Sequence, residues 1–109
     1  MLRYKLRDKT TAILVVPKAL PVGCTADSLR KQARRAGRVD TGYHVLLWLD
    51  GTHNNDRPIE AQATSDYPEA IMVLAAVDAK GELSNCQRHW LNTFAGIRQV
   101  DWEVIKDDE

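Results

Sequence analysis

The chain has 109 residues, of which 44% are hydrophobic and 28% are charged. This length suits one small domain with one hydrophobic core, so we treat residues 1–109 as a single domain. The composition is that of an ordinary globular protein and excludes fibrous or wholly disordered classes. No apolar run approaches the roughly 20 residues that a membrane-spanning helix needs.

The net charge is zero, but the two parts of the chain have opposite charge. Residues 1–38 carry ten Lys or Arg and two Asp or Glu, whereas residues 39–109 carry five and thirteen. A chain with this pattern either folds into a neutral mosaic or presents a basic face to an acidic partner.

The start of the chain and the cysteines favour a cytoplasmic protein of the host cell. The apolar run Ala12–Val16 ends at Pro17 and is shorter than a signal-peptide core. Residues 20–24 resemble a lipoprotein cleavage site only faintly. Cys24 and Cys86 belong to no CxxC pair or Cys/His cluster, which is typical of free thiols in a reducing compartment.

Two strands are predicted before the first helix. Leu2, Tyr4 and Leu6 alternate with basic residues, a period that predicts a half-exposed edge strand over residues 2–7. An uncovered edge of this kind could pair with a second copy of the chain, so we consider a homodimer. The continuous apolar run Ala12–Val16 predicts a central strand that ends at Pro17.

A basic helix follows. Thr25 is a suitable N-cap for a helix that runs to about residue 36, and Gly37 is a natural stop. One face of this helix carries small or aliphatic residues: Ala26, Leu29, Ala33 and Ala36. The opposite face carries Arg30, Lys31, Arg34, Arg35 and Arg38. This face is either simply solvated or a docking surface for acidic protein or phosphate.

A hairpin is predicted in the middle of the chain. Tyr43–Leu49 reads as a strand, Asp50 and Gly51 as its tight turn, and Thr52–Arg57 as a polar returning arm. Residues 59–68 are predicted to form a loop.

The last third predicts a buried strand, a helix and a short strand. Ala70–Val77 is continuously apolar, and residues 78–81 form a turn. Ser84 and Gln87 form a capping box that opens a helix to about residue 97. The residues expected to face the core are Trp90, Leu91, Phe94 and Ile97. A strand over residues 100–105 either completes the sheet or pairs with another chain. The predicted fold is α/β, with one mixed sheet of about five strands and two main helices packed on it.

The hairpin carries the clearest family resemblance. Asp40-Thr41-Gly42-Tyr43-His44-Val45, followed by Leu49-Asp50-Gly51-Thr52, resembles the D-x-G-Y-H-F strand and D-G-T turn of zinc-dependent N-acetylmuramoyl-L-alanine amidases. These are the enzymes of phage-lysozyme and peptidoglycan-recognition type, which cleave the bond between sugar and peptide in bacterial cell wall. Leu29-Arg30, Asp56-Arg57-Pro58 and Gln87 also match the family pattern. The resemblance implies an amidase-like fold, with Gly42, Tyr43, His44, Asp50 and Gly51 as motif remnants.

The departures from the family pattern concern the zinc ligands. Val16 stands where the family has its first zinc-binding histidine, and Pro17 follows it. The family's second histidine and its cysteine lie in a C-terminal part that is shortened here, so the fold is expected to be truncated. Catalytic zinc needs three protein ligands, and without it nothing activates the attacking water. We therefore expect no catalytic residue, no metal and no cofactor.

Other metal or nucleophile sites have weaker support. His53, Asn54, Asn55 and Asp56 follow the hairpin turn, where polar residues are common without binding a metal. Cys86 and His89 lie one helical turn apart, but no third partner is evident.

The sequence and the resemblance together lead to a functional hypothesis. We expect a non-catalytic amidase-like protein of phage or prophage origin that binds and inhibits or regulates a host or phage protein. Candidate targets are a polymerase or a defence complex, because some phage amidases of this type also bind a polymerase. The partner would have an acidic protein surface, and nucleic acid would be contacted only through a nucleoprotein target. The alternatives are a peptidoglycan-binding or muropeptide-binding module without hydrolase activity, and a residual or metal-independent enzyme.

Overall fold

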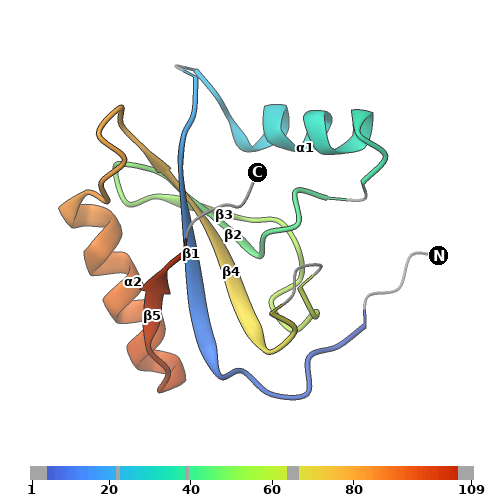
Figure 1. Cartoon of the computed structure of the whole chain (residues 1–109), viewed down its shortest axis with the longest axis vertical. Helices are drawn as coiled ribbons and strands as arrows, with labels where there is room; N and C mark the ends of the chain where they lie inside the picture. The colour runs from blue at the N-terminus through green and yellow to red at the C-terminus, as the bar shows by residue number, and fades with distance from the viewer. Residues whose placement is uncertain (1–4, 22, 39, 64–66, 106–109) are drawn as a thin grey trace.

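The structure is a computed structural model that describes residues 5–21, 23–38, 40–63 and 67–105. It contains one five-stranded sheet with the strand order β3-β2-β4-β1-β5 and two helices (Figure 1). The strands are β1 (Ala12–Ala19), β2 (Val45–Leu47), β3 (His53–Asn55), β4 (Ala70–Val77) and β5 (Trp102–Val104). The helices are α1 (Ala26–Arg35) and α2 (Asn85–Arg98).

The sheet is mixed, as predicted. β1 and β4 form its centre and pair in parallel over eight residues, and β4 is buried at every position. β2 runs parallel to β4, and β3 is the only antiparallel strand among those described. β5 pairs in parallel with β1 at Ile13–Val15, so the strand predicted over residues 100–105 completes this sheet.

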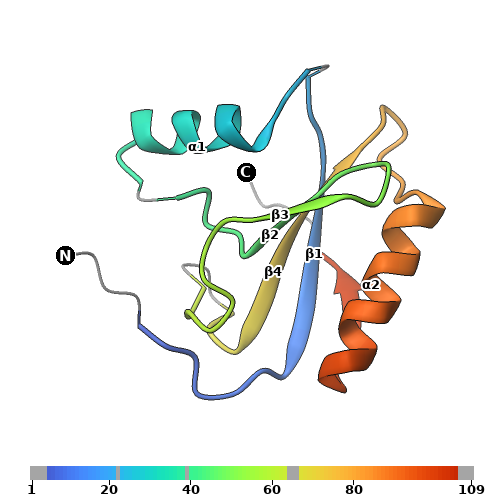
Figure 2. The same cartoon turned by 180° about the vertical axis from the view of Figure 1, so that it is seen from behind.

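The two helices cover opposite faces of the sheet (Figures 1 and 2). Because side chains alternate along a strand, odd-numbered residues such as Ile13, Val15 and Val73 pack on the α2 side with Leu91. Even-numbered residues such as Leu46 and Leu74 pack on the α1 side with Ala26. No helix of the described residues is long and apolar enough to span a membrane.

Pro17 does not end β1, contrary to the prediction. The N–H of Ile13 donates to Asp101 and the carbonyl of Val15 accepts from Ile105, so odd-numbered backbone groups of β1 point toward β5. The pairing with β5 stops at Val15, and Pro17 therefore loses no ladder hydrogen bond. On its other side β1 stays paired with β4 as far as Ala19.

The prediction of a strand over residues 2–7 is also wrong for the part that the structure describes, residues 5–7. Leu2 and Tyr4 lie outside the described residues. Leu6 makes a single antiparallel bridge to Ala61 and is 66% exposed. Two backbone hydrogen bonds, from Arg7 to Glu60 and from Gln62 to Lys5, attach this segment to the 60–62 loop. It is therefore not the free sheet edge that suggested a homodimer, which stays an untested prediction.

The inward face of α2 differs from the predicted one at its end. Gln87, Leu91 and Ala95 point into the core at i, i+4 and i+8, whereas Ile97 is 75% exposed. Ile97 lies on a neighbouring stripe with Trp90 and Phe94, which are partly buried at the side of the core.

Candidate functional site

Val16, which matches the position of the amidase family's first zinc-binding histidine, lies in an apolar cluster on the α1 side of the sheet. Val16 is 3% exposed and packs in a cluster that we call the Val16 cluster, composed of Leu14, Val16, Ala63, Ala70 and Met72. These side chains offer hydrocarbon and one thioether, and none of the imidazole, thiolate or carboxylate groups that bind zinc. The residues at this position do not fit a catalytic zinc ion.

Tyr43 lies between the Val16 cluster and the apolar residues beneath α1. Its ring is half-buried and packs against both the Val16 cluster and the cluster of Ala26, Leu46 and Leu74. This motif residue therefore packs between the two clusters.

His44 is fully buried and has a structural role. Its Nδ1 accepts a hydrogen bond from the backbone N–H of Met72 at 3.0 Å, and its Nε2 lies 2.7 Å from the carbonyl oxygen of Ala61. These two contacts together require the neutral ring with its proton on Nε2. Desolvation by burial lowers the pKa of His44, although the Ala61 carbonyl opposes this effect.

The residues around Gly42 form a tight turn held by a buried ion pair. Gly42 has a φ of 87°, a conformation that favours glycine, and its N–H donates to Oδ1 of Asp40 at 2.8 Å. The guanidinium of Arg57 donates to both oxygens of Asp40 at 3.1 Å. Both side chains are buried, and Arg57 also donates to the carbonyl of Gln62.

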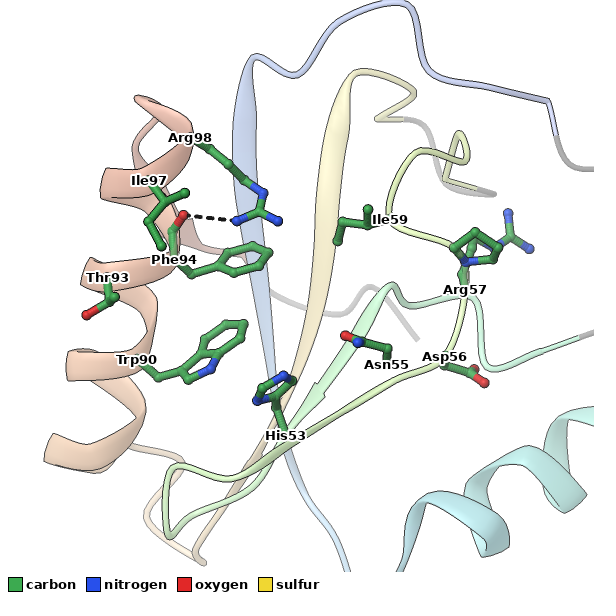
Figure 3. Close-up of a pocket in the computed structure, with 11 residues that line it drawn as sticks. His53, Asn55, Asp56, Arg57, Ile59, Trp90, Thr93, Phe94, Ile97 and Arg98 are labelled. Carbon is green, nitrogen blue, oxygen red and sulfur yellow. Dashed lines mark hydrogen bonds between the residues drawn. The ribbon is translucent and has the colours of Figure 1, made fainter.

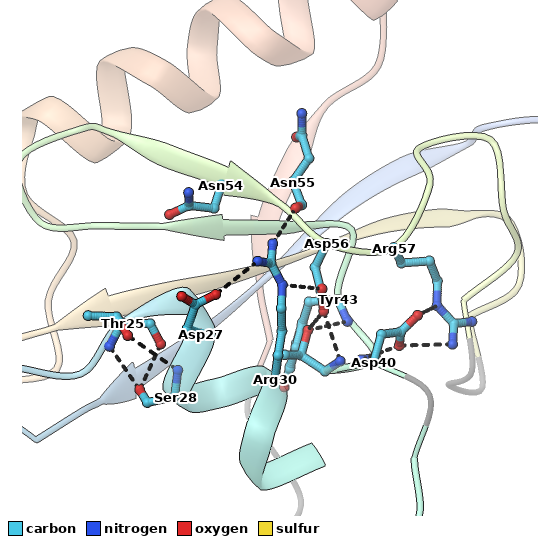
Figure 4. Close-up of polar contacts among 12 residues, drawn as sticks. Thr25, Asp27, Ser28, Arg30, Asp40, Tyr43, Asn54, Asn55, Asp56 and Arg57 are labelled. Atoms are coloured by element: carbon cyan, nitrogen blue, oxygen red, sulfur yellow. Dashed lines mark hydrogen bonds and ion pairs between the residues drawn. The ribbon is translucent and has the colours of Figure 1, made fainter. Parts of the chain in front are cut away.

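A second polar network ties α1 to the hairpin (Figure 4). Arg30 donates from Nε to Oδ1 of Asp56 at 2.8 Å and from Nη2 to the carbonyl of Asn55 at 2.8 Å. The other Asp56 oxygen accepts from the backbone and hydroxyl of Thr41. Burial acts to raise the pKa of Asp56, but the bonds from Thr41 and Arg30 outweigh it and hold the pKa below its usual value.

Asp50 and Gly51 form the hairpin turn and place it against α2. Oδ1 of Asp50 accepts from the hydroxyl and backbone of Thr52, and these bonds lower the pKa of Asp50. Gly51 has a φ of 88°, and a Cβ there would lie 3.0 Å from the Cβ of Cys86. The Ser84 hydroxyl also donates to the carbonyl of Leu49 at 2.6 Å. Both motif remnants therefore serve the fold.

The predicted binding residues on α1 divide into two groups. Arg30 is part of the network above, with 31% of its side chain exposed. The other four are exposed, and no hydrogen bond or ion pair holds their side chains within the described part of the chain. We call these four the α1 basic face: Lys31, Arg34, Arg35 and Arg38. Contrary to the prediction, Arg38 is not on the helix, because α1 ends at Arg35 and Arg38 follows its C-terminal turn.

The ends of α1 hold this face in a fixed orientation. Thr25 and Ser28 form a capping box, each side chain accepting from the other residue's backbone N–H. At the other end, Gly37 has a φ of 80°, its N–H donates to Arg34, and the N–H of Arg38 donates to Ala33. This pattern is a Schellman motif.

The structure does not bring together the weaker metal and nucleophile candidates named from the sequence. No group of three or more His, Cys, Asp or Glu side chains lies close enough to hold a metal among residues 5–21, 23–38, 40–63 and 67–105. Asp56 is occupied by Arg30 and Thr41, and His53 contacts the ring of Trp90. Cys24 and Cys86 are free thiols.

Sequence reasoning missed two features of this region. Gln87 is fully buried, and its amide donates to the carbonyls of Leu47 and Ala76 in addition to its role in the capping box. A pocket of about 510 Å³ also lies between α2, β3 and the loop that follows β3. The periodicity of Trp90, Phe94 and Ile97 indicated an apolar stripe, but it did not show that the stripe borders a pocket.

Together, the mixed sheet, the opposed helices and the D-x-G-Y-H strand with its D-G-T turn define the fold of the N-acetylmuramoyl-L-alanine amidases and peptidoglycan recognition proteins. The structure is similar to the endolysin amidase LysCS from Clostridium intestinale, with 15% identity and a TM-score of 0.68 over 94% of this chain and 77% of that one. It is similar to Drosophila peptidoglycan recognition protein SD, with 10% identity and a TM-score of 0.71 over 97% and 74%.

A third similar structure is the Ph2119 endolysin of a Thermus scotoductus bacteriophage, with 18% identity and a TM-score of 0.65 over 94% of this chain and 75% of that one. The chain thus spans about three quarters of each of these structures. No protein-family model matches the sequence, and no curated protein matches it significantly. At these identities the likeness shows the fold alone.

Proposed function

We propose that this chain is a non-catalytic protein with the amidase fold that binds an acidic surface of a protein partner through the α1 basic face. The observation that carries the proposal is the contrast within α1. Arg30 is used to fix the helix to the hairpin, whereas Lys31, Arg34, Arg35 and Arg38 are exposed without a partner among the described residues. Three like charges on one small helix and a fourth just after its C-terminal turn attract an acidic surface over several ångströms.

The absence of catalysis is part of the same proposal. The position expected to hold the first zinc ligand is filled by Val16 among aliphatic neighbours, and His44 is used in backbone hydrogen bonds. Two of the similar structures are endolysins, one of them from a bacteriophage, which supports a phage or prophage origin. Binding would then inhibit or regulate a host or phage protein, such as a polymerase or a defence complex, in the host cytoplasm.

The test compares capture from host-cell lysate by the wild-type chain and by the triple variant Lys31→Glu, Arg34→Glu, Arg35→Glu. The variant leaves the Arg30–Asp56 pair intact, so it should stay folded. The matched control reverses two exposed cations elsewhere, Lys80→Glu and Arg88→Glu. We expect one stoichiometric protein with the wild type and the control, and loss of at least about tenfold in affinity with the triple variant, because each cation contributes a charge-assisted contact.

The salt dependence and the identity of the captured species decide the outcome. Affinity for the partner should fall with rising salt, because exposed charges are screened within about 10 Å at 0.1 M. Equal capture by the wild type and the triple variant would contradict the assignment to α1. Capture that nuclease treatment abolishes would point to nucleic acid instead of protein.

The second candidate is a peptidoglycan-binding module without hydrolase activity, which is favoured by the likeness to Drosophila peptidoglycan recognition protein SD. Sedimentation with purified cell-wall sacculi tests this function directly. Retention in the supernatant would count against it, whereas co-sedimentation of the triple variant and the wild type alike would support it and weaken the first proposal.

A further inference from the structure

The pocket beside α2 lies on the opposite face of the sheet from both the Val16 cluster and α1. Its wall on the helix side carries Trp90, Phe94, Ile97 and Arg98, and the facing wall carries Asn55 and Ile59 (Figure 3). Trp90, Phe94 and Ile59 pack at the margin of the core on the α2 side. A volume of about 510 Å³ is in the usual range for pockets that bind small molecules.

Three aromatic side chains line the pocket, two of them stacked and the third tilted against the pair. Trp90 and Phe94 are stacked with centroids 4.5 Å apart, and His53 contacts the other end of Trp90 at 5.0 Å. The guanidinium carbon of Arg98 lies 3.8 Å from the centroid of Phe94. Because Trp90 and Arg98 occupy the two faces of Phe94, this ring meets the pocket with its edge. Ring edges carry partial positive charge and favour the electron-rich face of another ring or an anion.

Hydrogen-bond donors with spare capacity surround this stack. The indole N–H groups of Trp48 and Trp102 donate to Asn54 and Asn92, but within the described residues that of Trp90 has no acceptor. Arg98 makes one long bond of 3.4 Å to the carbonyl of Phe94, which leaves most of its five N–H groups available.

The charge balance of the pocket is positive. Asp56 lines the pocket, but its carboxylate is occupied by Arg30 and Thr41. Arg57 is occupied by Asp40 and by the carbonyl of Gln62. Arg98 is therefore the charged group of the wall that is left to bind a ligand, and its charge also acts on Arg7, whose pKa is lowered chiefly by burial.

From this geometry we propose that the pocket between α2 and β3 binds a small planar aromatic carboxylate. The ring of the ligand lies against the edges of Trp90 and Phe94 and against Ile59, and its carboxylate accepts from Arg98. This site is independent of the α1 basic face, since the two lie on opposite sides of the sheet (Figures 1 and 2).

The experiment titrates the ¹⁵N-labelled protein with three probes and follows the indole N–H signals of its three tryptophans by NMR. The probes are indole-3-acetate, its neutral amide indole-3-acetamide, and cyclohexylacetate, which keeps the carboxylate but lacks the planar ring. We expect the Trp90 signal to shift with indole-3-acetate, while those of Trp48 and Trp102 change little. The acid should bind about tenfold more tightly than the amide, because a charged acceptor strengthens the hydrogen bond to Arg98. It should also bind about tenfold more tightly than cyclohexylacetate, which has no aromatic face to contact the ring edges of Trp90 and Phe94.

Two variants separate charge recognition from loss of structure. Arg98→Gln should bind the acid and the amide equally, and Arg88→Gln, an exposed arginine on the same helix, should behave as the wild type. Arg98→Lys should retain part of the preference for the acid, which an unfolded pocket would not. The proposal is overturned if the Trp90 signal does not move at millimolar probe, or if the wild type binds acid and amide equally.

Discussion

His44 takes the place of a backbone group at the end of the pairing between β2 and β4. Its backbone N–H donates to the carbonyl of Met72, and its ring nitrogen accepts from the N–H of the same residue. The neighbouring Tyr43 is likewise engaged in packing. Tyr43 and His44 therefore both have structural roles in this chain.

The buried ring of His44 should make stability depend on pH. Burial lowers the folded pKa of His44 below the ordinary histidine value of about 6.5, so the unfolded chain binds a proton more readily than the folded one. The stabilisation is fully present above about pH 6.5 and is lost as the pH falls toward the folded pKa, with a slope of at most about 1.4 kcal/mol per pH unit. Urea unfolding of the wild type between pH 7.5 and pH 5 measures this slope.

The matched variants are His44→Gln, which should be less stable and lose most of this slope, and the exposed His89→Gln, which should keep it. A slope that is the same in His44→Gln as in the wild type would show that another group titrates.

Among charged residues, we expect substitution in the buried Asp40–Arg57 pair to reduce the free energy of unfolding most. Replacing Arg57 by methionine would leave the buried Asp40 carboxylate without its guanidinium, at a cost of about 3–5 kcal/mol. The exposed Lys80→Met should change stability by less than about 0.5 kcal/mol. Chemical denaturation measures both, and a small effect at Arg57 would mean that Asp40 is better solvated than its burial indicates.

At the level of single residues, the sequence was informative about position and less so about role. Asp50 and Gly51 form the hairpin turn that the D-G-T motif predicts, and the φ of 88° at Gly51 favours glycine. The turn at Gly42 was not predicted, because the motif was read there as a strand. The pairing of Arg30 with Asp56 was not predicted, since it joins residues 26 positions apart through tertiary contact. The buried amide of Gln87 was missed for the same reason.

At the level of the elements, the predictions are correct where a helix end or a strand depends only on residues close to one another in the sequence. The N-cap at Thr25, the capping box of Ser84, the stop at Gly37 and the apolar run of β4 all agree with the structure. The capping box that Ser28 completes with Thr25 was not predicted. The continuation of β1 through Pro17 could not be predicted from the local sequence. It depends on the pairing with β5 having ended at Val15, while the pairing with β4 continues to Ala19. The segment before β1 alternates like a strand, but its described part pairs only briefly with the 60–62 loop.

The Schellman motif of α1 makes a specific prediction. Gly37→Ala places a Cβ on a residue with a φ of 80°, where nothing lies within 4 Å of the new atom. The cost is therefore conformational, about 1 kcal/mol. A thermal melt measures it, and the α1 basic face should still bind its partner. A loss of more than about 3 kcal/mol would indicate that the turn carries contacts that the structure does not show.

At the level of the whole molecule, the sheet separates two surfaces with different chemistry. The α1 side carries the Val16 cluster and the α1 basic face, and the α2 side carries the aromatic pocket. The excess of basic residues in the first 38 positions is thus concentrated partly on one helix, and this could be anticipated from the sequence. The pocket could not, because it depends on how α2 lies against β3.

In the proposed function, a chain with the amidase fold and Val16 among hydrocarbon side chains binds a partner and does not hydrolyse peptidoglycan. The most direct test is incubation of the purified chain with muropeptides and excess zinc, with LysCS as the positive control, followed by mass spectrometry of the released peptide. We expect LysCS to release peptide and this chain to release none above background. Zinc-dependent release that scales with the concentration of this chain would contradict it.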